Sequence, residues 1–289
     1  MKFQIVTDSS ANLPDELIEK YDLHILSLLY YIGENEYESY VKGKQTDLTE
    51  IYARMRNKEV FTTSCMSIGT CRSIFENILQ QDKDLLYIGF SSALSATYQT
   101  SCQALEELRL EYPNRKILSV DTLAATLGEG LLVTYAAKFR KEGKTIEVVY
   151  DWLMENRLHL CHWFTVDDLF FLLRGGRVSA SSALLGTILN IKPIIHVNDT
   201  GHLIPVGKVR GKKNSLRALL KRMEETAIEP ENQTIYITHG DCLEDATYLA
   251  DKIREKFGTK NILIHLLEPV IGSHCGPGTV TLFYLGTKR

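Results

Sequence analysis

Two short segments rich in hydroxyl side chains stand out in the sequence, at residues 61–67 and 91–98. The second segment follows an apolar run at 85–90, which is typical of a buried strand. Small hydroxyl groups at the point where a strand gives way to a helix provide hydrogen-bond donors and leave the helix N–H groups accessible to an anion. The two segments therefore predict a site for a carboxylate or a phosphate.

Other polar residues also follow apolar runs that we interpret as strands. Asp8, the pair Ser91 and Ser92, and the pair Asp121 and Thr122 each stand directly after such a run. Ligands of open α/β sheets bind outside the carboxyl ends of the strands, so these residues form a polar rim. Aspartate, serine and threonine are also the preferred residues at helix N-caps, and we interpret Asp8, Asp121 and Thr122 as caps and turn residues.

The elements that must position these residues alternate between strand and helix in the first half of the chain. A helix at 15–21 has Pro14 in its first turn, and a strand at 24–31 follows. Further helices are expected near 48–57, 67–80, 95–111 and 123–142, and further strands near 85–90 and 116–120. This alternation predicts an α/β fold with a mainly parallel sheet flanked by helices on both faces.

The second half has a different pattern. Strands are expected at 160–166, 192–197, 233–238 and 262–267, with a helix near 242–256. Residues 198–201 join two apolar runs and are typical of a β-hairpin turn. We therefore expect two domains, an N-terminal α/β domain at 1–155 and a C-terminal mixed α/β domain at 156–289.

The composition of the chain argues against some classes of protein. A hydrophobic fraction of 44% and a charged fraction of 24% are ordinary for a soluble globular protein. A net charge of −3 argues against a general nucleic-acid binder, and the absence of a long apolar run argues against a membrane span. Because the first residues enter a strand directly and the six cysteines form no C-x-x-C pair, we expect a cytoplasmic protein with no disulfide framework and no metal site.

A third segment, at 273–279, combines His274 with glycine and proline just before the last apolar run. Together with the segments at 7–14, 173–179 and 192–195, and with the two hydroxyl-rich segments, it resembles the DegV family of bacterial fatty-acid-binding proteins. The resemblance runs in order over essentially the whole chain.

The resemblance implies roles for four residues. Thr63 and Ser95 match the family positions whose hydroxyl groups bind the fatty-acid carboxylate, although each type is also common as a helix cap. His274 matches the histidine that completes this cluster, and a bound carboxylate would favour its charged form. Arg177 has a similar status, because its guanidinium could contact either the ligand or neighbouring loops.

The sequence departs from the family pattern in both hydroxyl-rich segments. Cys65 and Met66 replace the usual glutamine and proline, which removes a restraint on the backbone. Ala93 and Ala96 stand where relatives often have glycine, so a positive φ is less favourable there. The departures alter the expected loop geometry but retain the hydroxyl groups.

A fatty-acid carrier needs few polar groups. Burying about 14 methylenes of a C16 chain yields roughly 11 kcal/mol at ~0.8 kcal/mol each, against association costs of ~4 to 15 kcal/mol. We expect the acyl chain to supply the driving force in an apolar tunnel between or beside the two domains. No cofactor other than the bound long-chain fatty acid is expected.

The resemblance also implies a partner. In the family, a separate ATP-dependent fatty-acid kinase phosphorylates the presented carboxylate to an acyl phosphate for phospholipid metabolism. The chain has no G-x-x-x-x-G-K-[ST] phosphate loop, so we expect the ATP site on the partner. Arg210, in the basic segment 208–213, matches a family position for kinase docking, although such a segment is also compatible with a solvated hairpin end.

The alternative from another functional class is a serine hydrolase. Residues 89–93 come close to the G-x-S-x-G nucleophile motif, with Ser91 or Ser95 as nucleophile and with Asp241 and His274 following in the required order. Ala93 replaces the final glycine, which weakens the tight turn of that motif. We therefore expect a binding protein without catalytic residues of its own.

Overall fold

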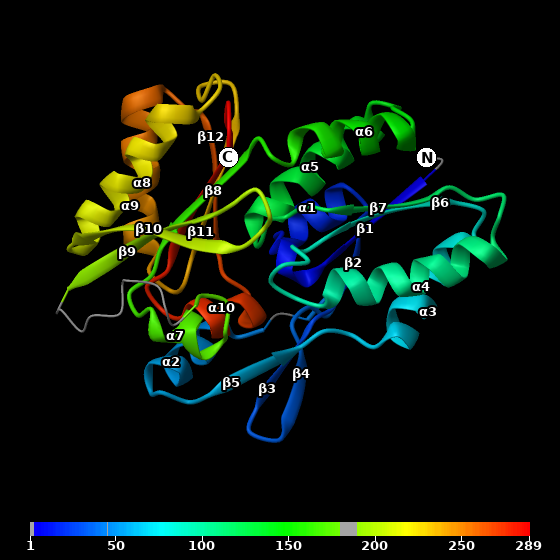
Figure 1. Cartoon of the computed structure of the whole chain (residues 1–289), viewed down its shortest axis with the longest axis horizontal. Helices are drawn as coiled ribbons and strands as arrows, with labels where there is room; N and C mark the ends of the chain where they lie inside the picture. The colour runs from blue at the N-terminus through cyan, green and yellow to red at the C-terminus, as the bar shows by residue number, and fades with distance from the viewer. Residues whose placement is uncertain (1–2, 45, 180–189) are drawn as a thin grey trace. The chain divides into compact units, whose positions relative to one another are not determined.

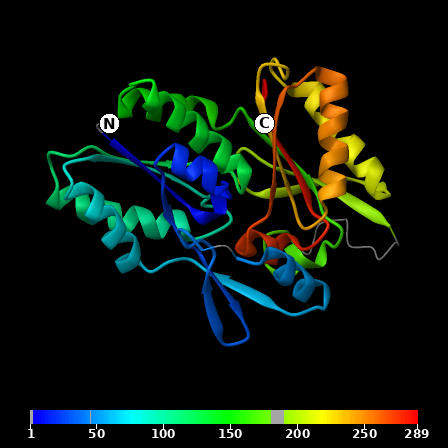
Figure 2. The same ribbon diagram turned by 180° about the vertical axis from the view of Figure 1, so that it is seen from behind.

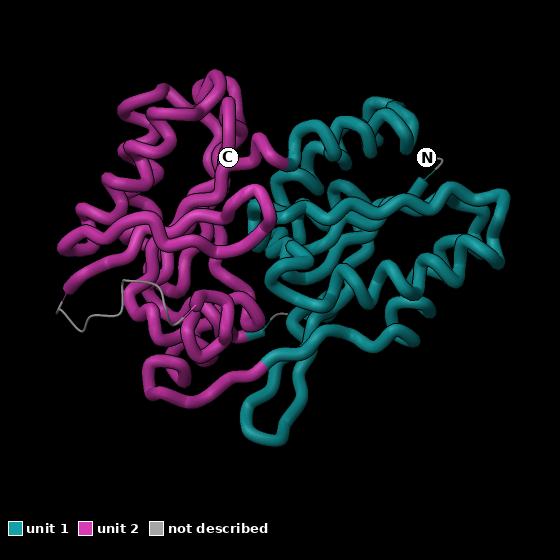
Figure 3. Tube along the Cα trace, viewed as in Figure 1, with its two compact units in different colours: residues 1–46, 63–157 teal, residues 47–62, 158–289 magenta. Residues whose placement is uncertain are grey.

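The computed structural model describes residues 3–44, 46–179 and 190–289, which form an α/β fold (Figure 1). The chain divides into two compact units, drawn in different colours in Figure 3. Unit 1 comprises residues 1–46 and 63–157, and unit 2 comprises residues 47–62 and 158–289. The chain therefore passes between the units three times, whereas a boundary near residue 155 implies a single passage.

Sheet A of unit 1 is fully parallel. Its strands, in spatial order, are β2 (His24–Leu26), β1 (Phe3–Asp8), β6 (Asp84–Gly89) and β7 (Ile117–Asp121). Every residue of β1 is buried, as expected for a strand covered on both faces. The strand order reverses between β1 and β6, so the loops that follow these two strands lie at the switch point where α/β sheets bind ligands.

Helices cover both faces of sheet A. Figure 1 shows α3 (Ile68–Leu79) and α4 (Thr97–Glu111) on one face, and α5 (Leu127–Lys141) and α6 (Ile146–Asn156) on the other. The mainly parallel, helix-flanked sheet expected for the first half is confirmed. Helix α6 was not predicted; Thr145 caps it by accepting a hydrogen bond from Val148 N.

Two local predictions near the N-terminus were wrong. Pro14 is the N-cap of α1 (Asp15–Lys20) and not part of its first turn. The single strand expected at 24–31 is divided into β2 and β3 (Leu29–Ile32), because the Leu28 N–H donates to Ser9 Oγ at 3.0 Å instead of to a neighbouring strand. Strand β3 then pairs in a separate small sheet with β4 (Asn35–Glu38) and β5 (Phe61–Ser64).

Unit 2 is built on a six-stranded mixed sheet. Its strands, in spatial order, are β10 (Leu203–Arg210), β9 (Ile191–Val197), β8 (Leu160–Thr165), β13 (Val280–Leu285), β11 (Thr234–His239) and β12 (Asn261–Leu266). Strands β11 and β12 are parallel, and the other neighbours are antiparallel. The predicted hairpin is confirmed as β9 and β10, with Val197 opposite Leu203.

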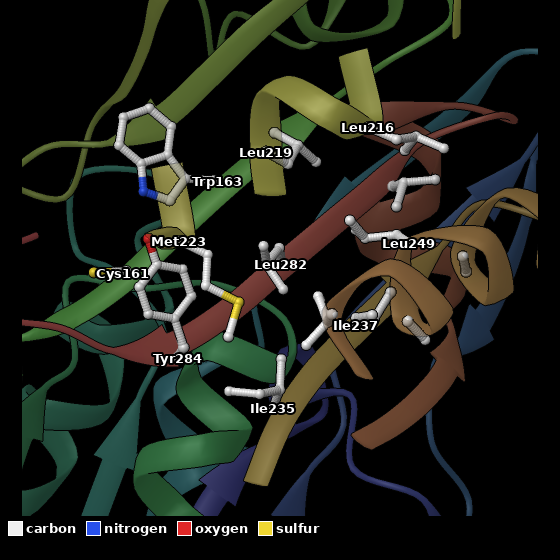
Figure 4. Packing of buried hydrophobic residues seen from close by; sticks show 14 of the residues in the cluster. Cys161, Trp163, Leu216, Leu219, Met223, Ile235, Ile237, Leu249, Leu282 and Tyr284 are labelled. Atoms are coloured by element: carbon white, nitrogen blue, oxygen red, sulfur yellow. The ribbon is translucent and has the colours of Figure 1, made fainter. Parts of the chain in front are cut away.

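Helices α8 (Lys212–Thr226) and α9 (Leu243–Phe257) cover one face of this sheet. Figure 2 shows the pair in yellow and orange beside the strands. Alternate residues of each strand enter the core between them, such as Cys161 and Trp163 of β8 and Leu282 and Tyr284 of β13 (Figure 4). This alternation is the period-two pattern of a strand with one face against helices.

A second helical group in unit 2 consists of α2 (Leu48–Arg56), α7 (Phe170–Arg174) and α10 (Pro269–Cys275). Tyr52 of α2 is fully buried, and its hydroxyl donates to the carbonyl of Leu267 at 3.1 Å. A Cβ atom at Gly272 would lie 2.6 Å from that hydroxyl, so the two helices touch where α10 has no side chain. This packing explains why residues 47–62 belong to unit 2.

Among the described residues, no helix is both long enough and apolar enough to cross a membrane.

Candidate functional site

The loops at the switch point of sheet A are held together by the carboxylate of Asp8. Its Oδ2 atom accepts hydrogen bonds from Phe90 N at 3.1 Å and from the Tyr87 hydroxyl at 3.2 Å, and its Oδ1 accepts from Ser10 N at 3.1 Å. Tyr87 in turn stacks on Tyr98 of α4, with 5.9 Å between the ring centroids. Asp8 therefore has the structural role expected of it and fixes the segment that carries the hydroxyl groups at 91–95.

Glu129 lies beside Asp8 and was missed in the sequence. It is fully buried in α5, and it accepts hydrogen bonds from Thr7 Oγ1 at 2.8 Å and Ser10 Oγ at 2.9 Å. Burial, together with the nearby charge of Asp8, raises the pKa of Glu129 well above its ordinary value. A glutamate between two glycines in an apolar helix is the signal that could have identified it.

Asp121 and Thr122 also act on the loop after β6. Asp121 Oδ1 accepts hydrogen bonds from Ser92 N at 3.3 Å and Leu123 N at 3.0 Å. Thr122 Oγ1 donates to the carbonyl of Gly89 at 2.8 Å. Both residues therefore shape the rim of the site, in agreement with their interpretation as turn residues.

Thr63 and Ser95 both belong to unit 1, near the N-terminal ends of the neighbouring helices α3 and α4. Both side chains are partly exposed. Ser95 Oγ accepts a hydrogen bond from Thr97 N at 3.2 Å, so this serine also serves the first turn of α4. Cys65 Sγ lies 3.9 Å from Thr100 Oγ1, so the first hydroxyl-rich segment contacts α4, the helix that follows the second.

The departures from the family pattern fit this geometry. Met66 is buried, so the residue that replaces proline is held by packing. The turn at 91–95 closes with hydrogen bonds from Leu94 N and Ser95 N to the carbonyl of Ser91, at 3.0 and 3.3 Å. No residue from 91 to 96 has a positive φ, so alanine at 93 and 96 is compatible with the loop.

His274 and Arg177 belong to unit 2. The imidazole of His274 lies against the backbone of Gly175, where an added Cβ would be 2.3 Å from Nδ1. Burial, followed by the charges of Arg177 and Arg174, lowers the pKa of His274 to about 4. A neutral imidazole beside two guanidinium groups is suited to an anion, because a hydrogen-bond donor and positive charge are both at hand.

Arg177 is itself partly buried, and burial lowers its pKa. Its guanidinium donates to the carbonyl of Gly175. This contact orders the turn that packs against His274, so Arg177 acts on the histidine through both its charge and the backbone.

Arg210 lies at the exposed end of β10, the edge strand of the unit 2 sheet. Lys212, two residues further on, forms ion pairs instead. Its Nζ lies 3.2 Å from Asp167 Oδ1 and 3.8 Å from Asp245 Oδ2. The basic segment at 208–213 is therefore not one uniform charged surface.

Two of the residues named for the hydrolase alternative, Ser91 and Asp241, have structural surroundings of their own. Ser91 is fully buried, which leaves its hydroxyl inaccessible to a substrate. Asp241 forms an ion pair with Arg56. Within the described ranges, no three His, Cys, Asp or Glu side chains gather in a way that could hold a metal ion.

Comparisons with known proteins give a consistent result. A model of the DegV family, described as uncharacterised proteins, matches residues 2–287. A DegV domain-containing protein of Clostridium perfringens is 45% identical over 288 residues, which cover 100% of this chain and 99% of the relative. A DegV domain-containing protein of Lactococcus lactis is 35% identical over 288 residues, with the same coverage.

Two solved structures are also similar to the chain. One is a DegV family protein of Thermus thermophilus described by its fatty acid binding, with a TM-score of 0.86, 29% identity and coverage of 99% of this chain and 100% of that chain. The other is DegV of Bacillus subtilis, described as a fatty acid binding protein, with a TM-score of 0.84, 25% identity and the same coverage.

The Glu129→Gln variant should gain stability relative to the native protein as the pH rises. The raised pKa means that folded Glu129 keeps a proton that the unfolded chain releases above its ordinary pKa, so its contribution to stability is lost as the pH rises. Urea unfolding at pH 5 and pH 8 measures this difference. The exposed Glu106→Gln variant is the control, and an equal effect of both substitutions at the two pH values would contradict the assignment.

The Gly175→Ala variant should displace His274 and destabilise unit 2 by about 1 to 3 kcal/mol, the usual cost of overpacking. Turned away from the two arginines, the imidazole should titrate closer to the ordinary histidine pKa than to about 4. NMR titration of His274 and urea unfolding test both effects. Gly69→Ala is the control, because its nearest neighbour is Ser67 Oγ at 3.8 Å; an unchanged His274 titration in Gly175→Ala would contradict the packing argument.

Proposed function

The chain belongs to the DegV family, and on this premise we propose that it binds one long-chain fatty acid and presents the carboxylate to a separate ATP-dependent kinase. The observation that carries the proposal is the surroundings of His274, a largely neutral imidazole packed beside Arg177 and Arg174. The positive charge of the two arginines disfavours protonation of the imidazole and favours a negatively charged ligand beside it. Fatty acid binding described for solved members of similar length and fold supports the choice of ligand.

The proposed carboxylate ligands are Thr63, Ser95, His274 and Arg177. Hydroxyl groups and a neutral imidazole supply hydrogen bonds, which fix the position of the carboxylate at modest energy, typically about 1 kcal/mol each. The acyl chain supplies most of the driving force by burial in an apolar tunnel. Mass spectrometry of lipid extracted from the purified protein tests this proposal, and a preparation that neither carries nor takes up fatty acid would contradict it.

Phosphorylation itself is assigned to the partner. In that step a carboxylate oxygen attacks the γ-phosphorus of ATP, the bond to the β-phosphate oxygen breaks, and ADP leaves with an acyl phosphate formed. The sequence has no phosphate-binding loop for this chemistry. We therefore propose that this chain works in the cytoplasm as the substrate-presenting component of phospholipid synthesis.

Thr63→Ala combined with Ser95→Ala should weaken fatty-acid binding by ~1 to 3 kcal/mol, because the carboxylate loses two hydrogen bonds in a partly desolvated site. Calorimetric titration with a C16 or C18 fatty acid measures the change. Thr62→Ala combined with Ser92→Ala is the control, since it removes two hydroxyl groups from the same segments. Equal affinities for the two double variants would exclude Thr63 and Ser95 from the site.

Arg210→Ala should retain fatty-acid binding and lower the rate of kinase-dependent acyl phosphate formation at limiting kinase, because exposed charges at an interface mainly accelerate encounter. The native rate should also fall as the salt concentration rises. The assay measures acyl phosphate formed with the kinase encoded in the same genome. Phosphorylation as efficient as that of the native protein would contradict the docking role of Arg210.

A further inference from the structure

Unit 2 has a groove of about 760 Å³, whose lining includes Arg174 but otherwise consists of residues not discussed for the carboxylate site. One wall consists of the end of α2 and the segment that follows it, as far as Val60. The other wall consists of α7 and the preceding residues Asp167 and Asp168. Figures 1 and 2 both show α2 and α7 near α10 in this part of unit 2. The groove therefore lies in the helical group that contains His274.

The rim of the groove exposes apolar side chains. Phe170 is 60% exposed and Val60 is 52% exposed, one on each wall. Phe171, the next residue of α7, is half-buried and lines the interior of the groove. An exposed phenylalanine at a concave, partly apolar surface is typical of a site that receives a side chain from another protein.

The charges of the lining residues indicate which partner fits. Arg56 pairs with Asp241, and Asp167 pairs with Lys192 at 2.7 Å and with Lys212. Among the described residues, Lys58 and Arg174 form no ion pair with a carboxylate.

Arg174 instead places its guanidinium 5.0 Å from the ring centroid of Phe171. The remaining acidic side chain, Asp168, accepts a hydrogen bond at 2.9 Å from the N–H of Phe170, the first residue of α7. Lys58 and Arg174 together outweigh the negative charge of Asp168, so the groove favours an apolar segment that is flanked by carboxylates.

Helix α7 connects the groove to the proposed carboxylate site. A Cβ at Gly276 of the loop after α10 would lie 2.6 Å from the ring of Phe171, and the end of α7 packs against His274 at Gly175. Lys212, two residues after Arg210, bonds to the carbonyl of Gly278 in the groove lining. An occupant of the groove would therefore contact the helix that positions His274.

We propose that this groove is the docking site for an acidic, apolar-tipped segment of the kinase that phosphorylates the bound fatty acid. The proposal rests on the proposed function, because that partner must reach the carboxylate near His274. Phe170 supplies the apolar contact, and Lys58 and Arg174 pair with the flanking carboxylates.

The experiment measures acyl phosphate formation by the kinase encoded in the same genome as the concentration of the oleate-loaded protein is varied. Phe170→Ser and Lys58→Glu should each raise the half-saturating concentration at least fivefold with kcat unchanged, and leave oleate affinity unchanged. Leu110→Ser, an 85% exposed leucine in unit 1, and Lys260→Glu, an exposed lysine in unit 2, are the matched controls and should behave as the native protein does.

Three results would overturn the proposal. One is native kinetics for both groove variants, and another is a loss confined to kcat. The third is a native dimer that Phe170→Ser converts to a monomer in sedimentation, which would make the groove a contact between copies of this chain. Failure of the native protein to bind oleate at all would instead contradict the proposed function, and the docking assignment with it.

Discussion

The carboxylate of Asp8 is the interaction on which the first unit depends. Parallel strands end at the same edge of a sheet, and their following loops need hydrogen-bond partners that the sheet no longer supplies. Asp8 provides them by accepting from Phe90 N, the Tyr87 hydroxyl and Ser10 N. One buried side chain therefore determines where the loop with Ser95 lies relative to β1.

Burial shifts the pKa of the acids of unit 1 and that of the histidine of unit 2 in opposite directions, although the physical cause is the same. Desolvation disfavours the charged form of any group, so it raises the pKa of Glu129 and lowers that of His274. Glu129 is satisfied by two hydroxyl groups and serves the interior of the unit. His274 has arginines beside it. The surroundings of His274 are therefore suited to an anion, whereas those of Glu129 are not.

The sequence predicted elements whose pattern is local and strong. The buried strand at 85–90, the hairpin of β9 and β10 and the helix-flanked parallel sheet all follow from apolar runs and turn residues. The break between β2 and β3 could not be predicted, because it depends on a hydrogen bond from Leu28 to Ser9, 19 residues away. The membership of α2 in unit 2 depends in the same way on Tyr52 packing against α10.

The candidate site shows the same division. Thr63, Ser95, His274 and Arg177 were predicted as ligands from their motifs, since motifs record residue types at fixed spacing. The neutral state of His274 could not be predicted from the sequence, because it results from burial and from the charges of Arg174 and Arg177, which only the fold brings near. Lys212 was grouped with Arg210 by charge alone, whereas the fold pairs it with two aspartates.

The arrangement of the arginines matters for a protein that presents a nucleophile. A bidentate guanidinium clamp would occupy the lone pairs of a carboxylate and hold it tightly. Here Arg177 donates to the carbonyl of Gly175, and Arg174 lies over Phe171, so both contribute charge while engaged with the protein. Under the proposed function, weak neutral donors would orient the carboxylate and leave an oxygen free to attack phosphorus. Such an arrangement favours transfer of the ligand over its retention.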